Sequence, residues 1–500
     1  MPITQVIEQA LFNGSSVPEL WNVLNPAIRE HGFAINSLLN MGAADSTIIN
    51  VTTYGADPTG ATDSTAAVAA AVTAIGASGG ILFFPTGIYK LGTINIANGM
   101  SIRGAGTLGT TIRAKDATGN VFNVTAERVE ISDMAFDAAV TRTAGAYVHF
   151  NTGANRSSIR NFYMSGYYTG VQITAAATVR ARDATFVNGA TTAGSAGILV
   201  DGGNDHYIDS ITMDAPNGSQ PKAGIQITQS GATQISNVDI VHHTECLLIN
   251  PGNGQDVSAT YVTNSFFDTA VRGIMIDPQG TGIVREFRAM GCWTSTMSQQ
   301  GVLVNNAGTG ARTGISFVDH HSFANAVNGL HVEKGNDVRV LGGIFAHNTG
   351  DGIVFAANVN EFSVIGARCG PAAGFNANSG WGINVIAGTS NNYQIINNDV
   401  RGNTTGSISD AGTGATKNIS ANLGYNPVGA SAITVTASPF TYTAGGSPET
   451  VYIIGGTITA IAVGAAARAV DIATKTVNLE PGDIVKVTYT AAPTMEKYIH

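Results

Sequence analysis

The residues best suited to acid–base chemistry gather near the middle of this 500-residue chain. Asp239, His242, His243 and Glu245 lie close together, and Asp268 follows about one repeat unit later. Hydrolysis of a glycosidic bond needs two carboxyl groups about 5–10 Å apart, one as the acid and one as the base or nucleophile. We therefore predict that Asp239 acts with Glu245 or Asp268, and that the two histidines assist in proton transfer.

A second group of residues is suited to binding a substrate. These polar or aromatic residues are predicted on or after neighbouring strands: Arg272, Trp293, Asp319, His320, His321 and His347. His242 and His347 occupy the same column, four coils apart, when the repeats are aligned. Flat aromatic rings bind the apolar faces of sugars. Asp and Asn residues also stabilise turns by accepting hydrogen bonds from turn amides, and this structural role is the alternative for each acidic candidate.

No metal or other cofactor is predicted, because the cysteines lack the spacing of metal ligands. Cys246, Cys292 and Cys369 each lie beside apolar strand residues. Their odd number and wide separation favour buried free thiols over disulfides or a metal centre.

A repeated phrase indicates which elements position these residues. A glycine, an apolar residue, any residue and a second apolar residue recur at Gly170, Gly197, Gly224, Gly273, Gly301, Gly329, Gly352 and Gly382, and Cys246 replaces one glycine. A period of 22 to 30 residues indicates stacked units. The apolar residues alternate with the period of a strand. The sequence therefore predicts an all-β protein, a right-handed parallel β-helix whose coils are about 4.8 Å apart.

The residue between the two apolar positions of each phrase should point outward. These residues are Gln172, Leu199, Gln226, Leu248, Met275, Leu303, His331, Val354 and Asn384, of which five are apolar. A solvated sheet face is usually polar, so an apolar stripe predicts a cover. We favour packing against other copies about a threefold axis over a loop of the same chain.

The composition argues against several classes of partner. The net charge is −9 and there is no run of Lys or Arg, so nucleic acid and anionic membranes are not expected partners. The apolar runs are shorter than the roughly 18 residues that cross a bilayer. The beginning, Met1-Pro-Ile-Thr, does not resemble a secretory signal peptide, so none is expected.

Three regions are expected. Residues 1–45 carry the pattern of short amphipathic helices that need a docking partner. Residues 46–425 form the β-helix, with an N-terminal capping helix at about 64–76 for which Asp57 and Asp63 serve as turn and cap residues. Residues 426–500 contain five short alternating segments that predict a small antiparallel β domain.

Two parts of the chain resemble known families. The run Tyr54-Gly-Ala-Asp57, Thr62-Asp63, Gly79-Gly80, Phe84-Pro85, Gly87-Ile-Tyr89 and Ser101-Ile-Arg-Gly-Ala-Gly106 resembles the opening of the pectate-lyase-like superfamily. The segments Ala437-Ser-Pro-Phe, Leu479-Glu-Pro-Gly and Ala492-Pro-Thr-Met resemble a C-terminal module of phage tail proteins. The chain lacks the paired Asp-Asp and the Gly-His-Gly signatures of alginate epimerases and polygalacturonases, so no catalytic residue is transferred from them.

The resemblance implies a phage tailspike. Such a protein would be a homotrimer on the virion tail that binds and depolymerises a bacterial surface polysaccharide, either capsule or O-antigen. Residues 1–45 would dock on the baseplate or a tail adaptor, and residues 426–500 would hold the trimer together or contact the receptor. Hydrolysis is the first expectation. The alternatives are a polysaccharide lyase of the same fold, a non-catalytic receptor-binding fibre, and an exported bacterial lyase or epimerase.

Overall fold

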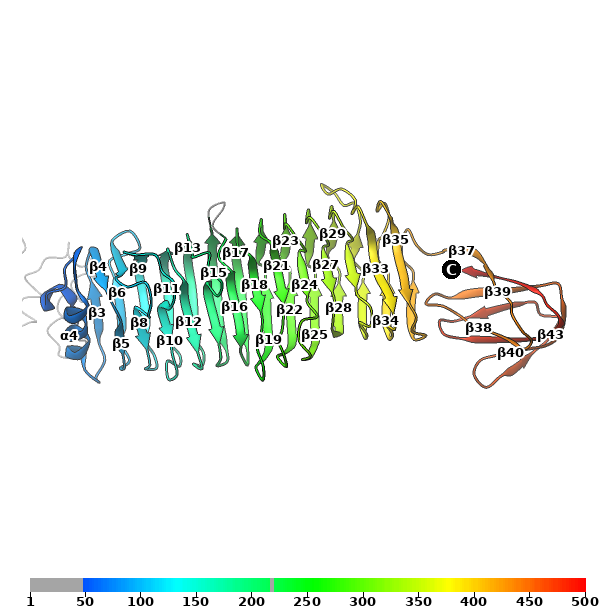
Figure 1. Cartoon of the computed structure of the whole chain (residues 1–500), viewed down its shortest axis with the longest axis horizontal. Helices are drawn as coiled ribbons and strands as arrows, with labels where there is room; N and C mark the ends of the chain where they lie inside the picture. The colour runs from blue at the N-terminus through cyan, green and yellow to red at the C-terminus, as the bar shows by residue number, and fades with distance from the viewer. Residues whose placement is uncertain (1–47, 216–219) are drawn as a thin grey trace, which may run out of the picture.

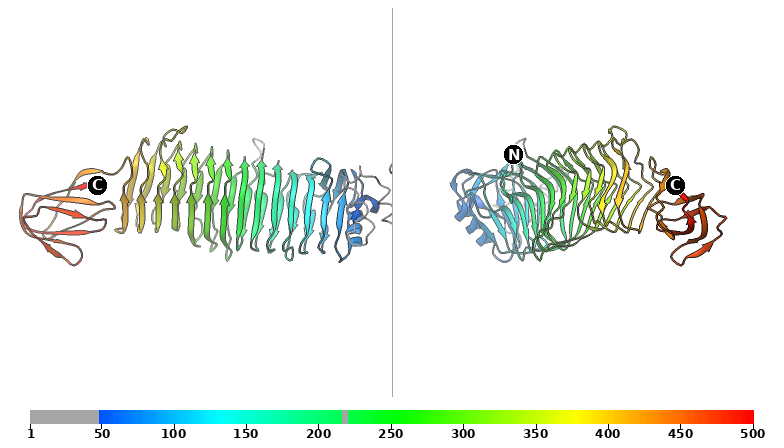
Figure 2. Two further views of the ribbon diagram at one scale, coloured as in Figure 1. Left: turned by 180° about the vertical axis from the view of Figure 1, so that it is seen from behind. Right: turned by 45° about the vertical axis from the view of Figure 1, so that its right-hand side comes forward.

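The molecule is a long stack of parallel β-strands followed by a small β domain (Figure 1). The computed structural model describes residues 48–215 and 220–500. The β-helix begins at β1 (Ile48–Asn50) and ends at β36 (Lys417–Ser420). The expected docking segment at residues 1–45 lies outside the described residues. The predicted parallel β-helix is confirmed, and Figure 2 shows the same regular stack from two further directions.

One turn of the helix contributes strands to three faces. The strands that carry the glycine phrase form a 13-stranded sheet from β5 (Ile94–Ile96) to β35 (Gly406–Gly412), which we call the glycine-strand sheet. It includes β16 (Ala223–Gln229), β18 (Glu245–Ile249) and β21 (Arg272–Ile276). Every neighbouring pair in this sheet is parallel, as in β16 with β18 and β18 with β21.

The rest of each coil is one long strand that bends over the other two faces. Examples are β11 (Ser158–Ser165), β13 (Arg180–Val187), β15 (His206–Asp214) and β17 (Thr233–Val241). Each bends at one residue in the left-handed region: Asn161, Asp183, Ser210 and Asn237, with φ between 48° and 56°. Asn and Asp tolerate this conformation better than most residues.

In later coils the bend divides the long strand into two. The divided pairs are β19 (Asp256–Thr263) with β20 (Phe266–Asp268), β22 (Ile283–Met290) with β23 (Trp293–Ser295), and β25 (Arg312–Val318) with β26 (His321–Phe323). We call the face formed by the ends of β13, β15 and β17 together with β20, β23 and β26 the second sheet.

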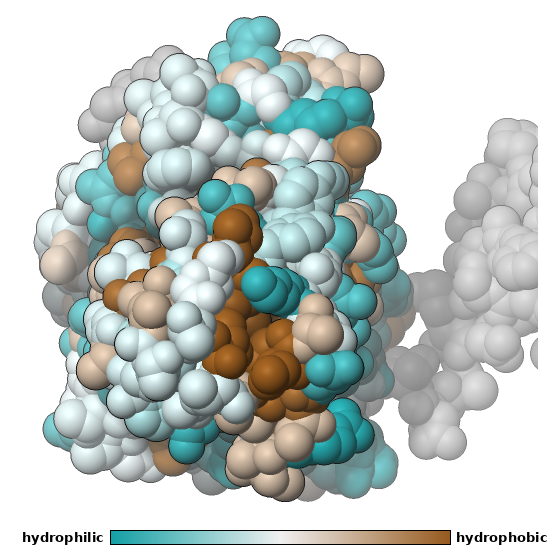
Figure 3. All heavy atoms as spheres, turned by 90° about the vertical axis from the view of Figure 1, so that its right-hand side faces the viewer, coloured by the Kyte–Doolittle hydropathy of each residue, from teal (hydrophilic) through white to brown (hydrophobic). Residues whose placement is uncertain are grey.

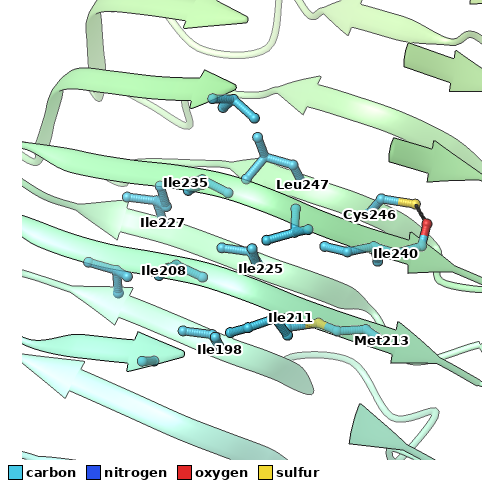
Figure 4. Packing of buried hydrophobic residues seen from close by; sticks show 14 of the residues in the cluster. Ile198, Ile208, Ile211, Met213, Ile225, Ile227, Ile235, Ile240, Cys246 and Leu247 are labelled. Atoms are coloured by element: carbon cyan, nitrogen blue, oxygen red, sulfur yellow. Dashed lines mark hydrogen bonds between the residues drawn. The ribbon is translucent and has the colours of Figure 1, made fainter. Parts of the chain in front are cut away.

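Close packing inside the coil explains the repeated glycine. A Cβ atom at Gly224 would lie 2.6 Å from Ile240 Cγ2 and 2.7 Å from the carbonyl oxygen of Cys246. Cys246 occupies the glycine position of the next coil, and its Sγ donates to Ile240 O at 3.3 Å (Figure 4). Burial raises the pKa of this thiol. The prediction of three buried free cysteines is confirmed.

A short helix covers the N-terminal end of the stack (Figure 1). Helix α4 (Thr65–Ile75) buries Val68, Ala71, Val72 and Ile75 in the main core. Asp63 Oδ1 accepts from the amide of Thr65 at 2.9 Å, and its other oxygen pairs with Lys115 at 2.8 Å. These contacts lower the pKa of Asp63 to about 2.

Asp57 has the predicted turn role. Its carboxylate accepts from the amides and hydroxyls of Thr59 and Thr62, which lowers its pKa well below the usual range. Both acidic residues are therefore structural, as expected.

The C-terminal module contains two four-stranded antiparallel sheets. One sheet consists of β37 (Gly429–Ile433), β44 (Thr494–Ile499), β39 (Glu449–Ile454) and β42 (Thr476–Leu479). The other consists of β38 (Phe440–Thr443), β43 (Ile484–Ala491), β40 (Thr457–Val463) and β41 (Arg468–Val470). Five of these strands match the expected segments, and β37, β41 and β44 were not predicted. The module also covers the last coil, because the amide of Ile419 donates to the carbonyl of Gly446.

The apolar outward stripe of the glycine-strand sheet is already shielded within one chain. Leu248, Met275 and Leu303 are 2%, 8% and 5% exposed, and they form a small cluster with Leu199, Ala196 and Ala223. The residues cover one another from coil to coil. The stripe therefore requires neither a second copy nor a covering loop, and the argument for a trimer that rested on it is withdrawn.

None of the helices in the described part of the chain is long and apolar enough to cross a membrane.

Candidate functional site

Two ladders of outward side chains run along the second sheet. Residue pairing between neighbouring strands defines the Asp239 ladder as Thr185, Thr212, Asp239, Phe266, Trp293 and His321. Two residues further along each strand, the Asp268 ladder consists of Val187, Asp214, Val241, Asp268, Ser295 and Phe323. Alternate strand residues face the same side, so both ladders lie on the outer surface.

Three carboxylates come together on these ladders. Asp239 lies in the coil between those of Asp214 and Asp268, offset by two residues along the strand. The strand spacing and rise place its Cα about 8 Å from each of the other two. His242 Nδ1 lies 2.8 Å from Asp214 Oδ1. We call Asp214, Asp239, Asp268 and His242 the acidic cluster.

The acidic cluster alters the titration of Asp239. Partial desolvation is the largest cause that raises the pKa of Asp239, and the negative charges of Asp268 and Asp214 raise it further. A carboxyl group that holds its proton beside ionised carboxylates is suited to general acid catalysis.

An aromatic strip continues from the acidic cluster toward the C-terminal end of the rod. Phe266 is 44% exposed, and its ring centroid lies 4.7 Å from that of Trp293. The next separations are 5.5 Å from Trp293 to Phe323 and 4.4 Å from Phe323 to Phe375. Phe375 lies in the loop between β32 (Arg368–Cys369) and β33 (Trp381–Gly388). Exposed rings gathered on one surface indicate a binding function.

Some predicted site residues lie on this surface. Trp293 and His321 belong to the Asp239 ladder, and His321 Nε2 lies 3.6 Å from Asp319 Oδ1. His347 is exposed, and its Nε2 lies 3.4 Å from Asn376 Nδ2. His242 and His347 both have a positive φ, at equivalent turns of coils that are four apart.

The structure places two other predicted histidines inside the coil. His243 is fully buried, its Nδ1 lies 2.7 Å from Val241 O, and burial lowers its pKa to about 4. His320 is also fully buried, stands against Phe317 and Phe345, and has its pKa lowered by burial to about 3. Neither ring reaches the outer surface, so we omit both from the proposed site.

Glu245 and Arg272 lie on the glycine-strand sheet and not on the second sheet. The Glu245 carboxylate is 1% exposed, 2.7 Å from Lys222 Nζ and 3.0 Å from Arg272 Nη1. Residues 242–244 turn the chain between the two sheets, which separates Glu245 from the outward ladders. Two cations already neutralise Glu245, so we assign the catalytic role to the other predicted partner of Asp239, which is Asp268.

Sequence reasoning missed Asp214, Phe266, Phe323 and Phe375. The first three could have been found by aligning the ends of the long strands, because positions 214, 241 and 268 are spaced by 27 residues, as are positions 239, 266 and 293. Phe375 lies in an irregular loop, for which no repeat provides a signal. No group of three or more His, Cys, Asp or Glu residues in the described part of the chain is arranged to hold a metal ion.

A hollow follows the same surface toward the N-terminal end. A cleft of about 670 Å³ is lined by Asp137, Arg142, Ser165 and Asn188, among others. Ser165 pairs with Val187, so the cleft borders the first residue of the Asp268 ladder. The acidic cluster therefore lies between an open cleft and the aromatic strip.

Comparison with known proteins agrees with this architecture. The family described as rhamnogalacturonase A/epimerase, pectate lyase-like, matches residues 48–337, which is more than half of the chain. The protein belongs to this pectate-lyase-like family. No curated protein matches the chain.

Several solved structures share the fold. The Dettilon tailspike protein is 10% identical, with a TM-score of 0.57, and the match covers 90% of this chain and 94% of that one. The tailspike of E. coli bacteriophage HK620, solved with a pentasaccharide, is 11% identical, with a TM-score of 0.53 and coverages of 90% and 93%. The A-module of the Azotobacter vinelandii mannuronan C-5 epimerase AlgE6 is 14% identical, with a TM-score of 0.50 and coverages of 75% and 98%.

Proposed function

We propose that this protein is a phage tailspike that binds and depolymerises a bacterial surface polysaccharide. The observation that carries the proposal is the acidic cluster set beside an exposed aromatic strip on one face of a long β-helix. A groove that extends along a rod suits a linear polymer better than a small molecule. Family membership and the shared fold of two tailspikes support the same assignment.

Hydrolysis fits the acidic cluster best. Asp239 would donate a proton to the leaving oxygen of the glycosidic bond, because its raised pKa keeps it protonated. Asp268 would act as the base that activates water. Their Cα separation of about 8 Å lies in the range of inverting glycosidases, in which a water molecule fits between the two carboxyl groups. Trp293, His321, Asp319 and His347 would contact neighbouring sugars.

The first experiment compares one catalytic variant with a matched control. Purified protein is incubated with host capsule or O-antigen, and oligosaccharide release is followed by gel filtration and reducing-end assay. Asp239→Asn should lower the cleavage rate by about 100-fold or more, since the proton donor is lost. Asp205→Asn should retain wild-type activity, because Asp205 is an exposed turn residue with a positive φ that Asn also accepts.

Two outcomes would contradict this assignment. Full activity of Asp239→Asn would remove Asp239 from the mechanism. Products that absorb in the ultraviolet as unsaturated uronates would show elimination, and the protein would then be a polysaccharide lyase. Binding of the polymer without any shortening would favour the non-catalytic receptor-binding fibre.

The proposal includes a homotrimer carried on the virion tail by residues 1–45. Support for the trimer comes from the C-terminal module and not from the stripe on the glycine-strand sheet. Tyr452, Ile454 and Ile472 are 42%, 49% and 48% exposed. Figure 3 shows an apolar patch on the end of the molecule that carries the module. Exposed apolar patches of this kind mark contacts with other chains.

A further inference from the structure

The second sheet carries an unusual balance of charge around the proposed site. Between Thr185 and Phe323, the Asp239 and Asp268 ladders contain three carboxylates and no Lys or Arg. The remaining members are hydroxyl, aliphatic and aromatic side chains and one histidine. A substrate that lies along these ladders would meet negative charge and aromatic rings.

The cations nearest to the ladders are already paired. Lys222 and Arg272 both bind the buried carboxylate of Glu245. At the C-terminal end of the second sheet, Arg368 Nε donates to the carbonyl of Pro371 at 2.6 Å, and its Nη1 lies 3.4 Å from Asp399. On the sheet that precedes the bend, Arg285 pairs with Asp256. None of these groups is placed to neutralise an acidic sugar over the acidic cluster.

We propose that the polysaccharide taken by this site carries no carboxylate on the sugars that contact the acidic cluster and the aromatic strip. This inference rests on the proposed function and specifies its substrate class. Stacking on Phe266 and Trp293 requires only an apolar sugar face. A uronate at the same place would lie beside Asp214, Asp239 and Asp268, and juxtaposed like charges reject a ligand. Uronate elimination also needs positive charge at the substrate carboxylate, which this surface does not offer.

The test uses pairs of polymers that differ only in charge. Acidic surface polysaccharides of known composition are each compared with the same polymer after chemical reduction of its uronic acids to neutral sugars, alongside naturally neutral polysaccharides. Binding is measured by calorimetry at low ionic strength, where charge effects are largest. For the polymer that the protein recognises, we expect the uncharged form to bind at least about tenfold more tightly than the acidic form.

Two variants test the cause of the discrimination. Asp214→Asn removes one negative charge, and Thr212→Lys adds a positive charge beside Asp239, with which Thr212 pairs across the strands. Each should improve binding of the acidic polymer and narrow the difference between the two forms. Asp205→Asn removes a negative charge outside the ladders and should leave the difference unchanged.

The outcomes separate this inference from the function on which it rests. Binding of an acidic polymer as tightly as its reduced form would overturn the inference and leave the polysaccharide function standing. Failure to bind any polymer in either form would overturn the proposed function and the inference together. A preference for the uncharged form that narrows in both ladder variants would support both.

Discussion

Asp239 shows how one residue acquires a functional property from its neighbours. Its carboxyl group resembles many others in sequence, yet partial desolvation and the charges of Asp268 and Asp214 raise its pKa. An acid catalyst must be protonated, so activity should persist until the pH rises through this raised pKa. The proton of Asp239 therefore sets the high-pH limb of the activity profile.

Asp214→Asn should shift that limb toward lower pH. The substitution removes one of the negative charges that raise the pKa of Asp239, so Asp239 would lose its proton at a lower pH. The measurement is the cleavage rate between pH 4 and pH 8, with Asp205→Asn as the control. An unchanged high-pH limb would show that Asp214 does not influence the proton donor.

At the scale of the element, each coil is held to the next by buried polar ladders as well as by strand pairing. Asn325, Asn348, Asn378 and Asn403 form one such ladder, with amide-to-amide distances of 2.8, 2.9 and 2.9 Å. His243 occupies the equivalent position, just after the left-handed turn residue, three coils earlier. This explains why a histidine that looked catalytic in the sequence is a core residue.

Asn348→Ala should destabilise the β-helix by about 2–4 kcal/mol, because it leaves buried amide groups of Asn325 and Asn378 without partners. Asn376→Ala removes an exposed asparagine and should cost less than about 0.5 kcal/mol. Thermal unfolding followed by circular dichroism distinguishes the two variants. Equal melting temperatures would show that the ladder contributes little to stability.

At the scale of the whole molecule, both ends of the stack are covered. Helix α4 closes the first coils, and the C-terminal module hydrogen-bonds to the last coil. Open ends would expose unpaired amides and carbonyls and promote aggregation. The sides remain free to display the acidic cluster and the aromatic strip.

We expect the full chain to be a trimer in light scattering and Ile454→Asp to shift it toward monomer, because Ile454 is an exposed apolar residue of the C-terminal module. Ile386→Asp, at an exposed residue of the β-helix, should remain trimeric. Leu248→Asp should instead lower stability, because Leu248 is buried within its own chain. A monomeric wild-type chain would remove the trimer from the proposal.

The amino-acid sequence alone was sufficient to predict the β-helix, because every coil repeats the same local constraint. A glycine is needed wherever a Cβ atom would collide with the next strand, as at Gly224, so the fold leaves a periodic signal. The buried thiols and the roles of Asp57 and Asp63 could be predicted for the same reason, since their partners are close in sequence or set by the period.

The composition of the site depended on tertiary structure. Glu245 is only six residues from Asp239, but the turn between them places it on another sheet between two cations. Asp214, in contrast, is 25 residues from Asp239 and lies beside it, because adjacent coils bring distant residues to the same surface. Whether an outward apolar residue is exposed or shielded also depends on its neighbours across coils, as Leu248 shows. Such relations are set by the stacking of coils and cannot be obtained from one repeat alone.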